Sequence, residues 1–151
     1  LFMHAITEQE RIAVILGGQP VLKVRIHTLN DLDEQIQRGF PKAALWHLIQ
    51  NLRLRQEVML KPLGISKATL ARYKKQQSGR LSDQVSDRLY RIASVIARAE
   101  QVLGDYESAS SWLKEGIPAL RGATPLSRLH TETGYQEVMD VLGRIEYGIY
   151  T

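Results

Sequence analysis

The side chains best suited to chemistry in this sequence lie in one short stretch, GISKATLARYKK, residues 64–75. Basic side chains neutralise phosphates, and polar groups near a helix N-terminus can reach phosphates or base edges. The stretch therefore predicts a helix that contacts DNA through Ser66, Lys67, Thr69, Arg72, Lys74 and Lys75. Arg72 could be bidentate to guanine or hold a phosphate, and the sequence leaves both open. The alternative is an ordinary helix with a solvated basic face.

The surrounding residues have the order of a helix-turn-helix. In EVMLKPLGISKATLARYKK a short helix precedes Gly64, which permits a tight turn, and Ser66 can cap the helix that follows. Leu70 and Tyr73 lie one turn apart and can pack inward. The basic residues of the second helix then point outward, as a helix in the major groove requires.

The charge distribution favours the DNA-binding interpretation. The net charge is +4 and the isoelectric point about 9.5. Residues 42–80 hold nine basic residues and a single acid, Glu57, whereas residues 105–151 hold four basic and seven acidic residues. Solvated surfaces usually mix the two signs. We therefore expect these two segments to meet different partners.

The sequence carries few signs of catalysis. His4, His27, His47 and His130 are scattered, and no phosphate-binding glycine loop or Gly-x-Ser-x-Gly motif occurs. Cysteine is absent, so neither disulfides nor thiolate metal sites are expected, and a reducing cytoplasm is the simplest location. No apolar run approaches the length of a membrane span. We predict no catalytic residues, no metal and no cofactor, although an enzyme with an unfamiliar site is a third interpretation.

The hydrophobic pattern predicts a mainly α protein with one possible strand. Residues 21–28 alternate apolar and polar side chains, which indicates a short strand, and Asn30 is a candidate cap for the helix that follows. After Pro41 the apolar spacing is helical throughout. The longest predicted helix, about 83–103, carries an apolar seam that is typical of a core helix or a dimer coiled coil: Val85, Leu89, Ile92, Ile96, Ala99 and Leu103.

The second half of the chain resembles the toxin-binding region of the Xre/MbcA/ParS antitoxins. The resemblance runs from Leu81 to Gly148 and depends on the order and spacing of several elements, since no single one is specific. These elements are Ser86-Asp87-Arg88-Leu89, Ala109 with Trp112-Leu113, Pro125-Leu126 with Leu129, and Thr133-Gly134 with Val138, Leu142, Ile145 and Gly148. The family also places an Xre-like helix-turn-helix in front, so the resemblance covers most of the chain.

The resemblance implies a fold and a function. Together with the residue pattern, it gives three expected regions: an N-terminal strand and helix extension over residues 1–41, a helix-turn-helix DNA-binding region over 42–80, and a helical toxin-binding and dimerisation domain over 81–151. Members are antitoxins of type II toxin–antitoxin pairs, form homodimers and repress their own operon. Their partner is a RES-domain toxin that consumes NAD, which they neutralise by direct binding. The alternative is a stand-alone dimeric transcriptional repressor without a toxin partner.

The end of the chain is a candidate inhibitory plug. In the family the C-terminal region blocks the active-site cleft of the toxin, and three extended residues reach about 10 Å. Apolar and aromatic side chains suit interface anchors, and a terminal carboxylate, if Thr151 is the natural end, would suit basic groups that hold the phosphates of NAD. The alternative is a tail that folds back or frays. The predicted toxin-binding residues are Arg144, Glu146, Tyr147, Gly148, Ile149, Tyr150 and Thr151.

Overall fold

The computed structural model describes residues 5–148, which are mainly helical and contain no strand. This confirms the predicted fold class. The α-helices are α1 (Glu8–Ile15), α2 (Gly18–Leu22), α3 (Leu29–Arg38), α4 (Lys42–Asn51), α5 (Leu60–Leu63), α6 (Lys67–Lys75), α7 (Asp83–Leu103), α8 (Tyr106–Leu113) and α9 (Glu132–Glu146). Three short 3₁₀ helices link them: η1 (Gln56–Met59), η2 (Pro118–Leu120) and η3 (Leu126–Arg128). No helix within residues 5–148 is long and apolar enough to cross a membrane.

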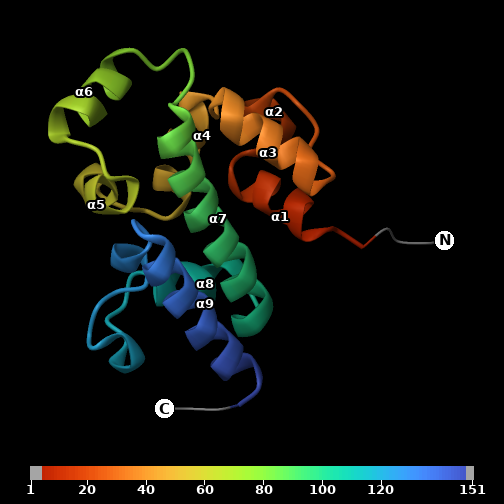
Figure 1. Ribbon diagram of the computed structural model, residues 1–151, viewed down its shortest axis with the longest axis vertical. Helices are drawn as coiled ribbons and strands as arrows, with labels where there is room; N and C mark the ends of the chain where they lie inside the picture. The colour runs from red at the N-terminus through yellow and green to blue at the C-terminus, as the bar shows by residue number, and fades with distance from the viewer. Residues whose placement is uncertain (1–4, 149–151) are drawn as a thin grey trace.

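The long helix α7 runs through the middle of the molecule, and most other helices pack against it (Figure 1). Helices α1, α3 and α5 contact it, as do α8 and α9 nearer its C-terminal end. Five of its six predicted seam residues are buried, and Leu103 is half-buried. Ser82 caps the helix by accepting a hydrogen bond from the Val85 amide. The seam is therefore intramolecular core, and α7 is the axis on which the other elements are placed.

The strand predicted for residues 21–28 is wrong. Val21 and Leu22 belong to the last turn of α2, and Lys23 then takes a left-handed conformation with φ of 65° that ends the helix. Leu22 and Ile26 both enter the core, four residues apart. A strand needs a neighbouring strand to satisfy its backbone groups. Here α2 packs against α1 and α4, whose own backbone groups are already paired within helices.

Thr28, rather than Asn30, caps α3. The Thr28 hydroxyl accepts a hydrogen bond from the Asp31 amide, and the Asp31 carboxylate accepts bonds from the amides of His27 and Thr28. These backbone hydrogen bonds, the one from His27 first, lower the pKa of Asp31. Asn30 lies two residues further along, in the first turn of α3, and donates to Glu34 instead. Because serine, threonine and asparagine are all good caps, the sequence alone could not rank the two positions.

The remaining helix boundaries largely follow the sequence signals. The apolar face of α4 is buried, Gly39 ends α3, and Asp105 caps α8. Thr124 and Pro125 precede the short η3, where the Thr124 hydroxyl accepts from the Ser127 amide. Helix α9 starts at a Thr131 cap. The two tryptophans are half-buried and pack against the core.

Candidate nucleic-acid and toxin-binding surfaces

The turn between α5 and α6 depends on a glycine. Gly64 has φ of 64° and ψ of 37°, and its amide donates to the carbonyl of Lys61. A Cβ at this position would lie 2.5 Å from Nη1 of Arg88, which itself donates to the Leu63 carbonyl at 3.1 Å. Glycine is thus favoured twice, by the left-handed backbone and by the guanidinium packed on the turn. These contacts set the angle between α5 and α6.

Backbone hydrogen bonds join the two ends of the segment that runs from α4 to the residues after α6. The Lys42 amide donates to the Gly79 carbonyl at 3.0 Å, and the Leu81 amide donates to the Phe40 carbonyl at 2.8 Å. The Phe40 amide in turn donates to the buried hydroxyl of Ser86 at 2.9 Å. The start of α4 and the residues after α6 are therefore held together on α7, and α5–α6 projects from a fixed base.

Two of the predicted DNA-contacting residues also build the start of α6. The Ser66 hydroxyl accepts from the Thr69 amide at 3.1 Å and donates to the Thr69 hydroxyl at 3.1 Å. Ser66 is exposed and Thr69 half-buried. The hydroxyl pair leaves lone pairs on Thr69 and no free proton on Ser66, so Ser66 is foremost a cap.

The outer face of α6 is basic. Leu70 and Tyr73 are buried as predicted, while Lys67, Arg72, Lys74 and Lys75 are exposed. Within residues 5–148, none of these four makes an ion pair. The guanidinium of Arg72 lies 5.9 Å from the centre of the Tyr73 ring, which restrains its position. The structure thus brings four of the six predicted residues together as uncompensated cations.

Sequence reasoning missed two small residues on the same face. Ala68 and Ala71 are exposed between the basic side chains. Small residues let a helix backbone approach the floor of a groove, and alanine can contact a thymine methyl group. Their spacing relative to Arg72 and Lys75 follows the helical period, so a helical projection of the sequence would have found them.

Three basic residues of the segment have structural contacts. Lys42 donates to the Gln76 carbonyl at 3.1 Å and lies 5.2 Å from the centre of the Tyr73 ring. Arg80 donates to the Gly39 carbonyl at 2.6 Å. Arg53 lies 4.0 Å from the Glu107 carboxylate, with both side chains exposed. The excess positive charge therefore concentrates on α6 more than the sequence count suggests.

Four of the predicted toxin-binding residues, Arg144, Glu146, Tyr147 and Gly148, lie within the described residues at the end of α9, and the carboxylate of Glu146 is held by a residue of α7. Both terminal nitrogens of Arg98 donate to the two carboxylate oxygens of Glu146, one at 2.9 Å. This bidentate bond from Arg98 lowers the pKa of Glu146, and the same carboxylate raises the pKa of Arg98. Glu146 therefore ties the end of α9 to α7, and a toxin would have to compete for it.

Arg144, Tyr147 and Gly148 are exposed beside this pair. Tyr147 is 78% exposed, and Gly148 has φ of 72°. An exposed aromatic ring at a helix end is the kind of side chain that interfaces bury. Ile149, Tyr150 and Thr151, which form the rest of the predicted plug, lie outside the described residues.

A second set of contacts braces the C-terminal helices. Arg121 donates to both carboxylate oxygens of Glu137, at 3.0 and 3.1 Å, and Arg128 lies 3.4 Å from the same carboxylate. Arg121 first and Arg128 second hold the pKa of Glu137 below its usual value. The hydroxyls of Ser94 and Tyr135 lie 3.0 Å apart and join α7 to α9. These pairs link residues distant in sequence, which no local pattern indicates.

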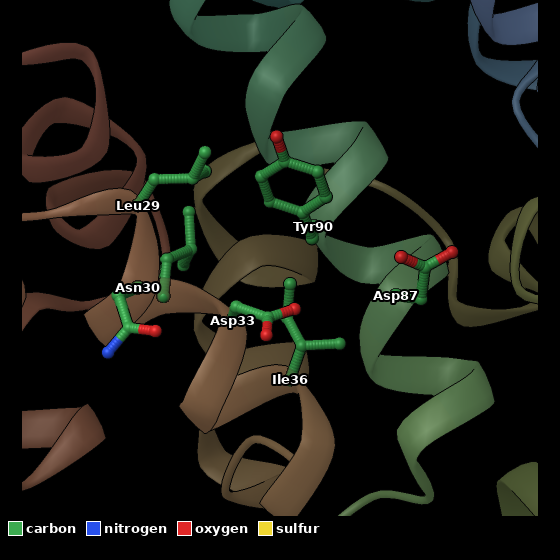
Figure 2. Close-up of a pocket in the computed structure, with 7 residues that line it drawn as sticks. Leu29, Asn30, Asp33, Ile36, Asp87 and Tyr90 are labelled. Atoms are coloured by element: carbon green, nitrogen blue, oxygen red, sulfur yellow. The ribbon is translucent and has the colours of Figure 1, made fainter.

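A groove with an acidic rim lies between α3 and α7 (Figure 2). Its volume is about 430 Å³, and its walls include Leu29, Ile36 and Tyr90. Leu29 is 61% exposed. The carboxylates of Asp33 and Asp87 stand at the edge, so this groove repels phosphate. Within residues 5–148, no group of three or more acidic or histidine side chains is arranged to hold a metal ion.

Two family models match the chain. A model described as the antitoxin Xre-like helix-turn-helix domain matches residues 31–94. A model described as the antitoxin Xre/MbcA/ParS C-terminal toxin-binding domain matches residues 98–148. The first match contains α5, α6 and the basic face, and the second contains α8, α9 and the Arg98–Glu146 pair.

Three curated relatives are similar to parts of the chain. "Antitoxin Xre" of Yersinia enterocolitica is 34% identical over 94 residues, which cover 62% of this chain and 63% of that relative. "Antitoxin Xre" of Photorhabdus laumondii is 39% identical over 72 residues, covering 47% and 49%. The "Prs ADP-ribosylating antitoxin" of a Sphingobium species is 28% identical over 124 residues, covering 76% and 77%. The chain thus spans 63% and 49% of the length of the first two relatives.

Proposed function

This chain belongs to the Xre/MbcA/ParS family of antitoxins, and on that premise we propose that it neutralises a toxin with α9 and the residues after it and binds operator DNA with α6. The observation that carries the proposal is the pairing of two distinct surfaces on one framework. An uncompensated basic face lies on α6, and an exposed aromatic end lies on α9. Helix α9 packs directly on α7, and α6 follows α5, which also packs on α7.

The toxin we propose is a RES-domain protein that consumes NAD. The name of the Sphingobium relative includes ADP-ribosylation, and transfer of ADP-ribose draws on NAD. A cleft that holds the phosphates of NAD needs basic groups, which suit an acidic, aromatic partner segment. The end of the chain, from Glu146 and Tyr147 through the residues after Gly148, is acidic and aromatic in this sense. We propose that it occludes the active site of the toxin, so this chain acts by binding and performs no catalysis.

The DNA half of the proposal is autorepression by a homodimer. A dimer presents two copies of α6 to two half-sites one helical turn apart. The expected footprint on the promoter of its own operon is therefore symmetric, and binding weakens steeply with salt. Lys67→Ala or Arg72→Ala should reduce the affinity. Unchanged operator affinity in both variants would contradict the assignment of α6.

The toxin half is tested by NAD consumption. The RES-like protein encoded beside this gene would be assayed with the full chain and with a version ending at Gly148, and binding would be measured in parallel. If the shortened version binds but no longer blocks turnover, the tail is the plug. Equal inhibition by both versions would place the block on the folded surface, and Tyr147→Ala then tests that surface. The stand-alone repressor alternative predicts no binding and no inhibition by either version.

A further inference from the structure

A hollow beside the recognition face has no assigned role. It is about 310 Å³ in volume and lies where the end of α4 meets the end of α6. Trp46 and Leu54 contribute apolar walls. The polar residues around it are Gln50, Gln56, Lys74 and Gln77. We call this feature the amide hollow.

The polar side chains of the amide hollow are unused by the protein itself. Within residues 5–148, none of the three glutamines and not Lys74 makes a side-chain hydrogen bond or ion pair. Gln50, Lys74 and Gln77 are exposed, and Gln56 is half-buried. The indole N–H of Trp46, behind them, also has no acceptor. Five unpaired donor groups therefore line one hollow, and all of them are available to an external acceptor.

The donor set fits one acceptor, a phosphate of the DNA backbone. Glutamine and lysine side chains are common phosphate ligands, and a single ammonium group offsets the single charge of a phosphodiester. The groove between α3 and α7 is larger but carries Asp33 and Asp87 at its rim, where a phosphate would be repelled (Figure 2). Lys74 also belongs to α6, so the amide hollow continues the surface that faces DNA.

We propose that the amide hollow binds one phosphate of the DNA strand that flanks the groove entered by α6. This inference rests on the proposed DNA binding of α6 and adds a second contact from α4 and the segment before α5. A contact on each side of the groove fixes how deeply and in which register α6 lies. Lys74 accordingly contacts the backbone, while Arg72 and Lys75 remain directed at the groove.

The test measures binding to two fluorescent duplexes, one carrying the promoter region of its own operon and one unrelated duplex of equal length, between 50 and 300 mM KCl. Lys74→Ala should reduce the slope of log affinity against log salt concentration by about one, and it should lower the affinity for both duplexes by the same factor. The double variant Gln50→Ala/Gln77→Ala should weaken both duplexes about three- to tenfold without changing the slope. Lys23→Ala, an exposed lysine after α2, is the matched control and should change neither quantity.

A second measurement identifies the phosphate. Single methylphosphonate substitutions, which remove one backbone charge, would be scanned across the promoter duplex. One position should weaken the wild type severalfold and weaken Lys74→Ala much less, because that variant has already lost the ammonium group that pairs with the phosphate charge. Circular dichroism of each variant checks the fold, and the three substituted residues are all exposed.

The outcomes separate this inference from the function on which it rests. If the wild type binds neither duplex, both the proposed DNA binding and the amide hollow fail. If Arg72→Ala weakens binding while Lys74→Ala and the glutamine variant do not, α6 binds DNA and the amide hollow is overturned. A loss restricted to the promoter duplex would mean that these residues read bases, which also overturns the phosphate assignment.

Discussion

Two glycines of α9 should respond in opposite directions to the same substitution. A Cβ built on Gly134 would lie 1.9 Å from the carbonyl oxygen of Arg128 and 3.0 Å from the Thr131 hydroxyl. At Gly143, nine residues further along the same helix, nothing lies within 4 Å of the added carbon. Neither glycine has a positive φ, so alanine is compatible with the backbone at both. The comparison therefore isolates the effect of space.

The expected magnitudes follow from these distances. A carbon and a carbonyl oxygen approach to about 3.3 Å at closest, so Gly134→Ala must separate α9 from the end of η3 by more than 1 Å. The buried side chains of Leu126, Leu129 and Val138 resist that movement. Overpacking of this kind costs about 1–3 kcal/mol, and disturbing the Thr131 cap costs about 1 kcal/mol more. Alanine recovers about 0.5–1 kcal/mol of helix propensity, which leaves a loss of about 1–3.5 kcal/mol.

Urea unfolding followed by circular dichroism measures both variants, at one fixed protein concentration because a dimer would make stability concentration-dependent. Gly143→Ala should raise the free energy of unfolding by about 0.5–1 kcal/mol, since it gains propensity and meets no neighbour. Gly134→Ala should lower it. Equal shifts of the same sign in the two variants would refute the argument, because helix propensity alone would then explain both.

Three further outcomes are expected. Ser66→Ala removes the α6 cap and should lower thermal stability by about 1 kcal/mol, and an unchanged melting temperature would contradict the cap. Gly64→Ala should cost about 1–2 kcal/mol for the left-handed backbone, and more because Arg88 must move. The cost of Gly64→Ala should therefore be smaller in an Arg88→Ala background. Equal costs in the two backgrounds, measured by denaturant titration, would contradict the contact between Arg88 and the turn. The pKa of Glu137 is lowered by Arg121, so its ion pair contributes stability that is present above the ordinary pKa of 4.5 and is lost as pH falls through the lower folded value. The free energies of unfolding of wild type and Glu137→Gln should therefore differ by at most about 1 kcal/mol at pH 7 and converge in acid.

The helices of the helix-turn-helix could be predicted because their signals are local. The buried positions of α6 lie three residues apart, its cap lies directly before it, and the turn glycine precedes the cap. Each of these depends on neighbours within one or two turns. The alternation of residues 21–28 is equally local, yet it misled, because whether a segment forms a strand is decided by what lies beside it. Here the neighbours are α1 and α4.

The roles of individual charged residues could not be predicted for the same reason. Glu146 was expected to face a toxin, and it is held by Arg98, 48 residues away in sequence. Arg80 counts toward the basic segment, but it donates to the Gly39 carbonyl. A charge count sees only composition, whereas the free charge on a surface depends on which groups the fold has already paired. This explains why α6 stands out more clearly in the structure than in the sequence.

Substitutions in α7 change the framework that supports both surfaces, so they are poor tests of function. Arg88 contacts the turn before α6, and Arg98 holds the end of α9, about 15 Å further along the same helix at 1.5 Å per residue. A change at either arginine therefore alters the framework of an interface as well as its surface charge. Lys74 and Tyr147 are exposed and lie at the two surfaces without such a contact within residues 5–148. Loss of binding in those two variants can accordingly be assigned to the interface itself, which is why the tests of both surfaces should begin with them.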